Sequence, residues 1–303
     1  MKKTLFKIIK YLLPNFFIKR IKDLLGSLKH QYFLSKLKKD ILKYYSNRTK
    51  DKETAEIIKY LEKKTISVFP YEFTKKYSKD IVQVFSDEKT GLKYVMHQRK
   101  RLFFKRSLSE NAIKSLYVGL QIDQDPDSPH LYLTKEFNLD SMDVIADIGA
   151  AEGNFSLSNV EKVKKIYLFE SNQEWVEALR ATFKPWENKV IIVNKFVTNH
   201  DSDQTVNINT FYSINSDITF FKVDIEGEEK KFLSSCSLLF DQLKNVKIAI
   251  CTYHKHYDEQ DFKKYFLDLG FEIEHSKGYM IYIYDNLIKA PFLRRGLLRA
   301  EKK

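Results

Sequence analysis

From residue 143 onward, the hydrophobic positions of the chain predict a regular alternation of strands and helices. Short runs rich in β-branched residues alternate with longer stretches whose apolar residues have helical spacing. This alternation predicts strands at 144–148, 166–169, 190–193, 218–223 and 246–252, and helices near 154–163, 173–183, 228–242 and 258–269. It is typical of a parallel sheet covered by helices on both faces.

The end of the chain has a different pattern. Two apolar runs, 271–275 and 279–284, flank Lys277 and Gly278, and we interpret them as a hairpin. The last strand should therefore run antiparallel to the others. The expected fold is α/β, a Rossmann-like, mostly parallel sheet of seven strands with an antiparallel last strand.

Residues 51–140 predict a mixed region with short strands. A helix is expected near 53–64, followed by β-like runs at 81–85, 92–96 and 102–104, with turn residues Asp87, Glu88 and Gly91 between the first two. The stretch DQDPDSPH from Asp123 to His130 should form an ordered loop. We expect three parts in all: an arm at 1–50, the mixed region at 51–140, and a cofactor-binding domain at 141–303.

The first 50 residues predict a basic, amphipathic helical arm. Apolar residues recur at helical spacing before and after a break near Pro14: Leu5, Ile8, Ile9, Leu12, Leu13, Phe16, Ile21, Leu24, Leu25 and Leu28. Such an arm either lies in a membrane interface or packs on the enzyme or a partner subunit, and periodicity does not separate the two. Lys7, Lys10, Lys19 and Arg20 interrupt the apolar residues, so neither a signal peptide nor a membrane span is expected.

Charge narrows the choice of partner. The net charge is +12, and residues 1–50 contain 14 basic and 2 acidic residues, which leaves 38 of each sign in the rest of the chain. A neutral body lacks the basic surface that tracks phosphates, so no nucleic-acid partner is expected. The two cysteines, Cys236 and Cys251, show no metal-ligand spacing, so no metal is predicted, and they fit a cytoplasmic protein.

The segment VIADIGAAEG, residues 144–153, is an apolar strand that ends in a turn of small residues. Gly149 allows the tight turn, Ala151 allows close approach of a ligand, and Gly153 lets the following helix start close to the strand. Glu170 ends the next strand, where it can accept hydrogen bonds from both ribose hydroxyls of a nucleoside. Asp147 suits the cationic ammonium and sulfonium groups of S-adenosylmethionine better than a pyrophosphate.

A second cluster follows the strand predicted at 218–223. Lys222, Asp224 and Glu226 alternate along an extended chain and so project to one side, at the carboxyl edge of the sheet. The next strand brings His254 to the same edge, and a histidine is suited to removing a proton from a hydroxyl group. An ion-paired turn and a hydrogen-bonded loop histidine are the structural alternatives; Glu228 and Glu229 are interpreted as favouring a helix N-terminus.

With these blocks in order, the chain resembles the FkbM-type methyltransferases, especially bacterial members associated with surface glycans. The resemblance covers roughly residues 80–300, in the blocks DQDPDSPHLYL, DVIADIGAAEGNFSL, IYLFES, ITFFKVDIEGEE, AICTYHKHYD and APFLRRGLLRA. It implies a class I methyltransferase sheet, S-adenosylmethionine as methyl donor and O-methylation of a hydroxyl, on a sugar. The residues implied as donor ligands are Asp147, Gly149, Gly153 and Glu170, and those implied near the acceptor are Asp224, Glu226 and His254. We further predict Ala151 and Ser171 on the donor side and Lys222 among the catalytic residues. Ser171 stands where the family has proline, and Ala151 where glycine is frequent.

The resulting hypothesis is a cytoplasmic O-methyltransferase for a glycan or lipid-linked saccharide, which the arm at 1–50 places at the inner leaflet of the membrane. Two alternatives stay open. A nicotinamide-dependent sugar oxidoreductase shares the strand, the glycine turn and the acidic partner. A non-catalytic, membrane-associated assembly factor would retain the pocket without its chemistry.

Overall fold

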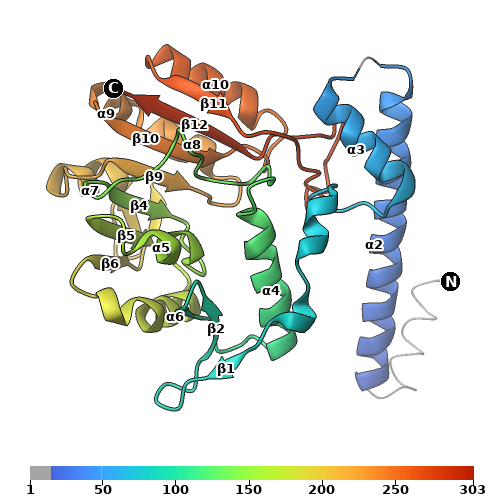
Figure 1. Ribbon diagram of the computed structural model, residues 1–303, viewed down its shortest axis with the longest axis horizontal. Coiled ribbons are helices and arrows are strands. Elements are labelled where there is room, and N and C mark those ends of the chain that lie inside the picture. Colours follow the sequence, from blue (N-terminus) through green and yellow to red (C-terminus); the bar gives the residue numbers. More distant parts are fainter. Residues whose placement is uncertain (1–14, 49) are drawn as a thin grey trace.

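The centre of the molecule is a seven-stranded sheet (Figure 1). A computed structural model describes residues 15–48 and 50–303. The strand order is β11-β12-β10-β9-β4-β5-β6, and within it only β12 runs antiparallel to its neighbours. The strands are β4 (Val144–Ile148), β5 (Lys165–Phe169), β6 (Val190–Val193), β9 (Phe220–Val223), β10 (Val246–Cys251), β11 (Glu272–His275) and β12 (Leu297–Lys302). The predicted α/β class, with a mostly parallel seven-stranded sheet and one antiparallel strand, is confirmed.

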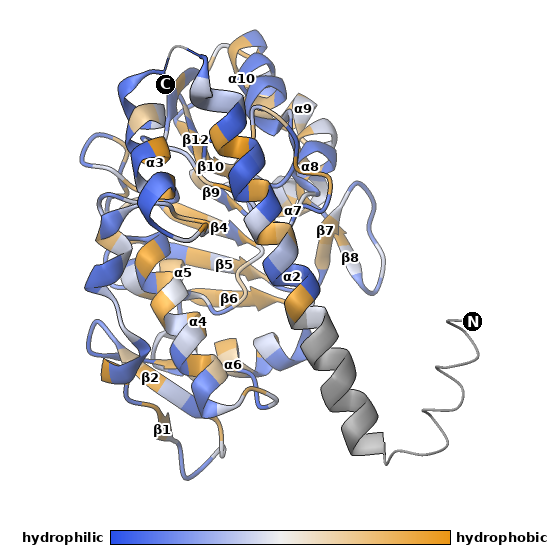
Figure 2. Cartoon of the chain, turned by 90° about the vertical axis from the view of Figure 1, so that its right-hand side faces the viewer, coloured by the Kyte–Doolittle hydropathy of each residue, from blue (hydrophilic) through white to orange (hydrophobic). Residues whose placement is uncertain are grey.

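Both faces of the sheet are buried, because alternate residues of each strand face opposite helical layers. Ile145 faces one layer and Ile148 the other, and Figure 2 shows the strands β4, β5 and β6 largely in the hydrophobic colour. The first layer contains α4 (Glu110–Asp123), α5 (Asn154–Asn159) and α6 (Gln173–Phe183). The second contains α7 (Ile208–Ile214), α8 (Glu229–Ser235), α9 (Ser237–Gln242) and α10 (Asp258–Asp268).

The predicted helices agree with the structure where capping is strong. The helix at 173–183 has its predicted bounds, because the Asn172 side chain accepts hydrogen bonds from the amides of Glu174 and Trp175. The single helix predicted at 228–242 is wrong, because it is divided into α8 and α9 at Cys236, whose backbone is not helical. Helix α5 ends at Asn159, four residues before the predicted end.

The predicted hairpin of 271–275 and 279–284 is wrong. Residues 271–275 do contribute β11, but its antiparallel partner is β12, which pairs with it from Glu272↔Glu301 to His275↔Leu298. Residues 279–284 form a coil in which Met280 bridges to Arg294 and the Ile281 amide bonds to the Val68 carbonyl. The run IYIY has strand-like alternation but is used to pack against the N-terminal region.

The N-terminal region has two helices beside the sheet domain (Figure 1). They are α2 (Asn15–Ser46) and α3 (Lys52–Lys63), and Leu37 and Ile41 of α2 are buried in one cluster with Ile57 and Leu61 of α3. Their cluster also includes Leu293. The apolar face of α2 is therefore covered by the protein itself at residues 37–45, whereas Leu28 is 52% exposed and residues 5–13 lie outside the described residues.

Short strands occur in the mixed region close to the runs predicted at 92–96 and 102–104, whereas the run predicted at 81–85 is wrong except at its last residue. An unpredicted helix, α4, follows these strands. The strands are β1 (Phe85–Ser86), β2 (Lys93–His97) and β3 (Lys100–Phe103), which form a small antiparallel sheet, and β7 (Phe196–Thr198) and β8 (Thr205–Asn207) pair in parallel elsewhere. Three 3-10 turns complete the elements: η1 (Glu72–Lys76), η2 (Lys79–Ile81) and η3 (Lys184–Trp186). Among the described residues, every helix is too short or too polar to cross a bilayer.

Candidate active site

A pocket of about 890 Å³ lies at the carboxyl edge of β4, β5, β9 and β10. The turn after β4 and the end of β5 line one half of it, with Gly149, Ala151, Glu170 and Ser171. The other half is lined by residues from three segments that follow α4, β9 and β10, and by the coil at 279–284: His130, Tyr132, Lys222, Asp224, Ile225, Glu226, Tyr253, Met280, Tyr282 and Tyr284. Two sequence clusters that were predicted separately thus meet in one cavity, which has the size of a small-molecule site.

The glycine turn is fixed by contact with its neighbours. Gly149 has φ +78°, and a Cβ built on it would lie 1.9 Å from the carbonyl oxygen of Asp224. Gly153 has φ +76°, and its Cβ would lie 2.6 Å from Leu179 of α6. The amides of Gly149 and Ala150 both donate to the Phe169 carbonyl at 3.1 Å, which joins the turn to the end of β5. Gly149 and Gly153 are therefore required by backbone shape and close packing, as predicted from the turn.

Glu170 holds its carboxylate at the rim of the pocket. One oxygen accepts from the Ala151 amide at 3.0 Å and the other from the Asn172 amide at 2.7 Å. Each carboxylate oxygen has a further lone pair, so Glu170 can still accept hydrogen bonds from a ligand. Ser171, the next residue, also lines the pocket.

Asp147 lies one layer beneath the pocket and is outside its lining. Its carboxylate is 1% exposed, accepts from the Ser156 hydroxyl at 2.6 Å and lies 3.1 Å from Nζ of Lys222. Lys222 in turn donates to the Gly149 carbonyl at 2.7 Å. Burial alone would lower the pKa of Lys222, but Asp147 and Asp224 outweigh it and raise this pKa above its usual value. Lys222 is thus a fixed cation that links β4, β9 and the glycine turn, and it is unsuited to be a proton acceptor.

Asp224 is the central residue of the second half of the pocket, which the segments after α4, β9 and β10 line. Its Oδ2 accepts from the Tyr132 hydroxyl at 2.9 Å and lies 3.8 Å from Nε2 of His130, while Oδ1 lies 3.7 Å from Nε2 of His254. Burial would raise the pKa of Asp224, but Lys222 and the two histidines outweigh it and lower this pKa. The carboxylate is therefore charged at neutral pH.

His254 lies behind Asp224 and Glu226, buried against Tyr253 and Tyr282. Its Nδ1 is 3.0 Å from Oε1 of the fully buried Glu229, close enough for an ion pair although not aligned for a hydrogen bond, and its Nε2 is 3.6 Å from Glu226. Burial would lower the pKa of His254, whereas Glu229, Asp224 and Glu226 outweigh it and raise this pKa. Asp224, Glu226 and His254 are thus brought together, with the two carboxylates facing the pocket.

Several site residues were not predicted from the sequence. Glu229 was interpreted as a helix N-terminal residue, and the loop containing His130 and Tyr132 as structural only. Glu152 and Asp123 also line the pocket; burial raises the pKa of Glu152 to about 7 and, with Asp224 and Glu152 nearby, that of Asp123 to about 8. The conspicuous DQDPDSPHLYL stretch was the available signal for His130 and Tyr132.

No protein-family model matches the sequence, and no curated protein matches it. Among solved structures, the chain is similar to a methyltransferase FkbM of Methylobacillus flagellatus, with 15% identity and a TM-score of 0.43 over 63% of this chain and 53% of that one. This chain thus matches about half of that protein. It is also similar to an rRNA methylase of Streptococcus thermophilus, with 14% identity and a TM-score of 0.37 over 54% of this chain and 89% of that one. A third is TrmK of M. capricolum in complex with S-adenosylhomocysteine, with 12% identity and a TM-score of 0.37 over 57% and 70%.

Proposed function

We propose that this chain is an S-adenosylmethionine-dependent O-methyltransferase that transfers a methyl group to a hydroxyl of a glycan or lipid-linked saccharide. The observation that carries the proposal is the single pocket in which the glycine turn and Glu170 face Asp224, Glu226 and their histidine partners. Methyl transfer needs both halves, because donor and acceptor must be held close and in line.

The amides of the glycine turn favour a sulfonium donor over a dinucleotide. A bound pyrophosphate takes hydrogen bonds from free amides of such a turn. Here the amides of Gly149 and Ala150 already donate to the Phe169 carbonyl, and the Ala151 amide donates to the Glu170 carboxylate. The lining also contains five carboxylates against three lysines: Asp123, Glu152, Glu170, Asp224 and Glu226 against Lys105, Lys195 and Lys222. Asp123 and Glu152 are largely or partly neutral near pH 7 because burial raises their pKa values, and a cationic donor would favour their charged forms whereas a phosphate would oppose them.

The acceptor half has the groups that a hydroxyl nucleophile needs. The acceptor oxygen forms its bond to the methyl carbon as the carbon–sulfur bond breaks, and the electron pair stays on sulfur to give S-adenosylhomocysteine. Asp224 accepts the hydrogen bond of the acceptor hydroxyl and relays the released proton to Nε2 of His254, which lies 3.7 Å behind it, and Glu229 stabilises the imidazolium that forms. Glu226 can accept a hydrogen bond from a second hydroxyl of the acceptor. Lys222 fixes the position of Asp147 and the glycine turn from beneath.

The wall of the pocket supports the proposal of a saccharide acceptor. Tyr253, Tyr282 and Tyr284 form a chain of aromatic contacts, with ring centroids 5.1 and 5.7 Å apart, and the Tyr282 hydroxyl donates to Glu226 at 3.4 Å. A tyrosine offers an apolar ring with a polar hydroxyl. This combination suits a sugar ring, which has C–H faces and hydroxyl edges.

Calorimetry with separate ligands tests the donor assignment. S-adenosylmethionine and S-adenosylhomocysteine should bind, whereas NAD and NADH should not. Binding of a nicotinamide cofactor instead would show that the chain is an oxidoreductase and not a methyltransferase.

Incubation with methyl-labelled donor and cell-envelope saccharides tests the acceptor class. It should label a saccharide with the wild-type protein and not with His254→Ala, and His256→Ala serves as the matched control. Donor binding with no transfer to any saccharide fraction would contradict the proposed acceptor class.

A further inference from the structure

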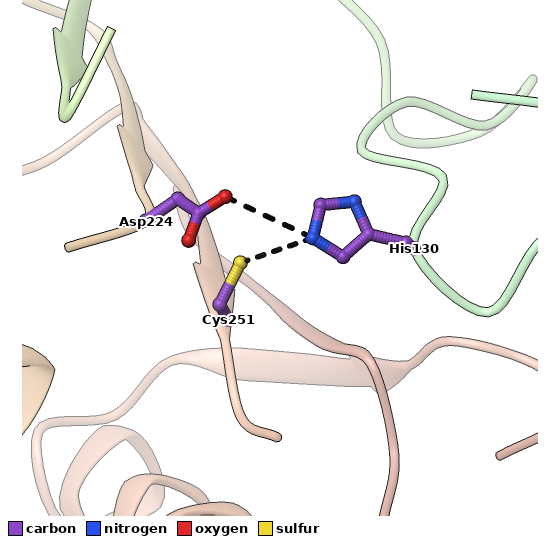
Figure 3. Close-up of side chains that lie close together, drawn as sticks. All are labelled: His130, Asp224 and Cys251. Atoms are coloured by element: carbon purple, nitrogen blue, oxygen red, sulfur yellow. Dashed lines mark hydrogen bonds and ion pairs between the residues drawn. The ribbon is translucent and has the colours of Figure 1, made fainter. Parts of the chain in front are cut away.

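A third kind of donor atom, the thiol sulfur of the fully buried Cys251, lies directly behind the carboxylates and histidines of the acceptor half of the pocket. His130 comes from the loop after α4, Asp224 from the end of β9 and Cys251 from the end of β10, and Figure 3 shows their side chains converging. We propose that these three residues form a binding site for a transition-metal dication of the Zn²⁺ class, open on the pocket side.

The distances between the three side chains fit one ion. Nε2 of His130 lies 3.5 Å from Sγ of Cys251 and 3.8 Å from Oδ2 of Asp224. A nitrogen and a sulfur bound tetrahedrally to Zn²⁺ at their usual bond lengths lie about 3.6 Å apart. The N, O and S donors select zinc over magnesium or calcium, which prefer oxygen alone.

The surroundings match those of a catalytic rather than a structural site. His130 and Asp224 line the pocket, so a fourth position faces the acceptor, as in zinc sites that bind water or substrate. Tyr132 donates to the Asp224 carboxylate at 2.9 Å and thereby orients it. Both His130 and Cys251 are at most 5% exposed.

A second group of possible donors, Asp224, Glu229 and His254, fits an ion less well. Glu229 already accepts from the Ile225 amide and pairs with His254, and neither residue lines the pocket. Charge does not oppose a cation at the first group, because the nearby Lys222 is already matched by Asp147. The inference rests on the proposed function for its purpose, since the ion would hold the acceptor oxygen and favour its deprotonation.

Cobalt and zinc binding test the site directly. The full chain, freed of metal with a chelator and dialysed against Co²⁺ or Zn²⁺, should bind about one ion, and the cobalt form should show a thiolate-to-cobalt absorption band. Cys251→Ala should lose the band and weaken binding by at least roughly tenfold. Cys236→Ala removes the other buried cysteine and should keep both. His130→Asn provides a second ligand variant, with circular dichroism to verify its fold.

Three results would overturn the site: no Co²⁺ or Zn²⁺ bound by the wild type, an unchanged band and affinity in Cys251→Ala and His130→Asn, or binding of Mg²⁺ alone. Donor binding measured by calorimetry on the metal-free protein separates this inference from the proposed function. If the protein binds the donor but no metal, only the metal site is refuted. If it binds metal but shows no donor binding in either the metal-free or the metal-loaded form, the proposed methyltransferase function is refuted.

Discussion

Single residues at the glycine turn have two separable roles, backbone shape and space. Gly149 and Gly270 have nearly the same left-handed φ, +78° and +77°, but a Cβ at Gly149 would collide with the Asp224 carbonyl whereas one at Gly270 would meet nothing within 4 Å. A comparison of the two positions therefore measures what close packing between β4 and β9 adds to the backbone requirement.

We expect Gly149→Ala to lower the free energy of unfolding by about 3 kcal/mol or more and to abolish donor binding, because the turn must move away from β9. Gly270→Ala should cost only about 1 kcal/mol, the conformational strain, and leave donor binding intact. Chemical denaturation and calorimetry measure both effects. Equal losses in the two variants would show that contact with Asp224 is unimportant.

Glu152 makes donor binding depend on pH. Burial raises the pKa of Glu152 to about 7, so the free protein has this carboxyl largely neutral below pH 7 and charged above it. A cationic donor stabilises the charged form, and the affinity for S-adenosylmethionine should therefore rise between about pH 6 and 8, by at most about tenfold per pH unit for one proton. The gain ends once the carboxyl is fully charged.

Calorimetric titrations at several pH values check this expectation. S-adenosylhomocysteine lacks the sulfonium charge and should show a smaller rise. Glu152→Gln should flatten the profile for the cationic donor; Asp123, with a pKa of about 8, leaves a residual slope at higher pH. A steep profile retained by Glu152→Gln would assign the dependence to another group.

At the scale of elements, β12 does more than complete the sheet. Its Arg299 is 3% exposed and donates to the carbonyls of Leu131 and Tyr132 at 2.5 and 3.0 Å, and it pairs with Glu274 of β11. Arg299 is thus a positioning residue: it ties the loop that presents His130 and Tyr132 to the last strand.

Arg299→Met keeps the length of the side chain but leaves these buried carbonyls without a donor. We expect it to lower the free energy of unfolding by about 2–4 kcal/mol and to reduce methyl transfer more than donor binding. Arg101→Met removes a largely exposed ion pair with Asp87 and should cost at most about 1 kcal/mol. Thermal unfolding and the labelled-donor assay distinguish the two; a similar small effect of both variants would contradict the role of Arg299.

An element could be predicted from the sequence when the residues that determine it are adjacent along the chain. The bounds of β4, β6 and α6 were predicted because apolar runs and a capping Asn172 are adjacent in sequence. Strand β12 was missed because its buried face includes Arg299, which reads as a surface residue until the loop above it is known. The pairing of Glu229 with His254 was missed for the same reason: the partners are 25 positions apart and meet only through the packing of α8 against β10.

For the whole molecule, charge is separated between the N-terminal arm and the body. Within the described part of α2, Lys29, Lys36 and Lys39 are exposed, and the body that follows is formally neutral. We propose that this asymmetry directs the chain to an anionic membrane surface, which would bring the pocket to lipid-linked acceptors.

The full chain should therefore bind vesicles containing anionic lipid and be released by salt, because exposed charges are screened. Changing Lys29, Lys36 and Lys39 to Glu should weaken binding by about two orders of magnitude, since each basic residue contributes about 1 kcal/mol. The same change at three exposed lysines of the body, Lys89, Lys164 and Lys244, should have little effect. Vesicle sedimentation measures both, and equal losses would indicate that only net charge matters.

The close contact between Gly149 and the backbone of Asp224 limits how this scaffold can diversify. The two halves of the pocket meet at this contact and leave no space between the backbones, so we expect that moving the tip of β9 to change acceptor preference would also displace the glycine turn and weaken donor binding. Adaptation is left to the loop at 123–132 and the coil at 279–284, which reach the pocket from outside the parallel strands. Homologous proteins with different acceptors should accordingly vary in these two segments while keeping the close contact between Gly149 and Asp224.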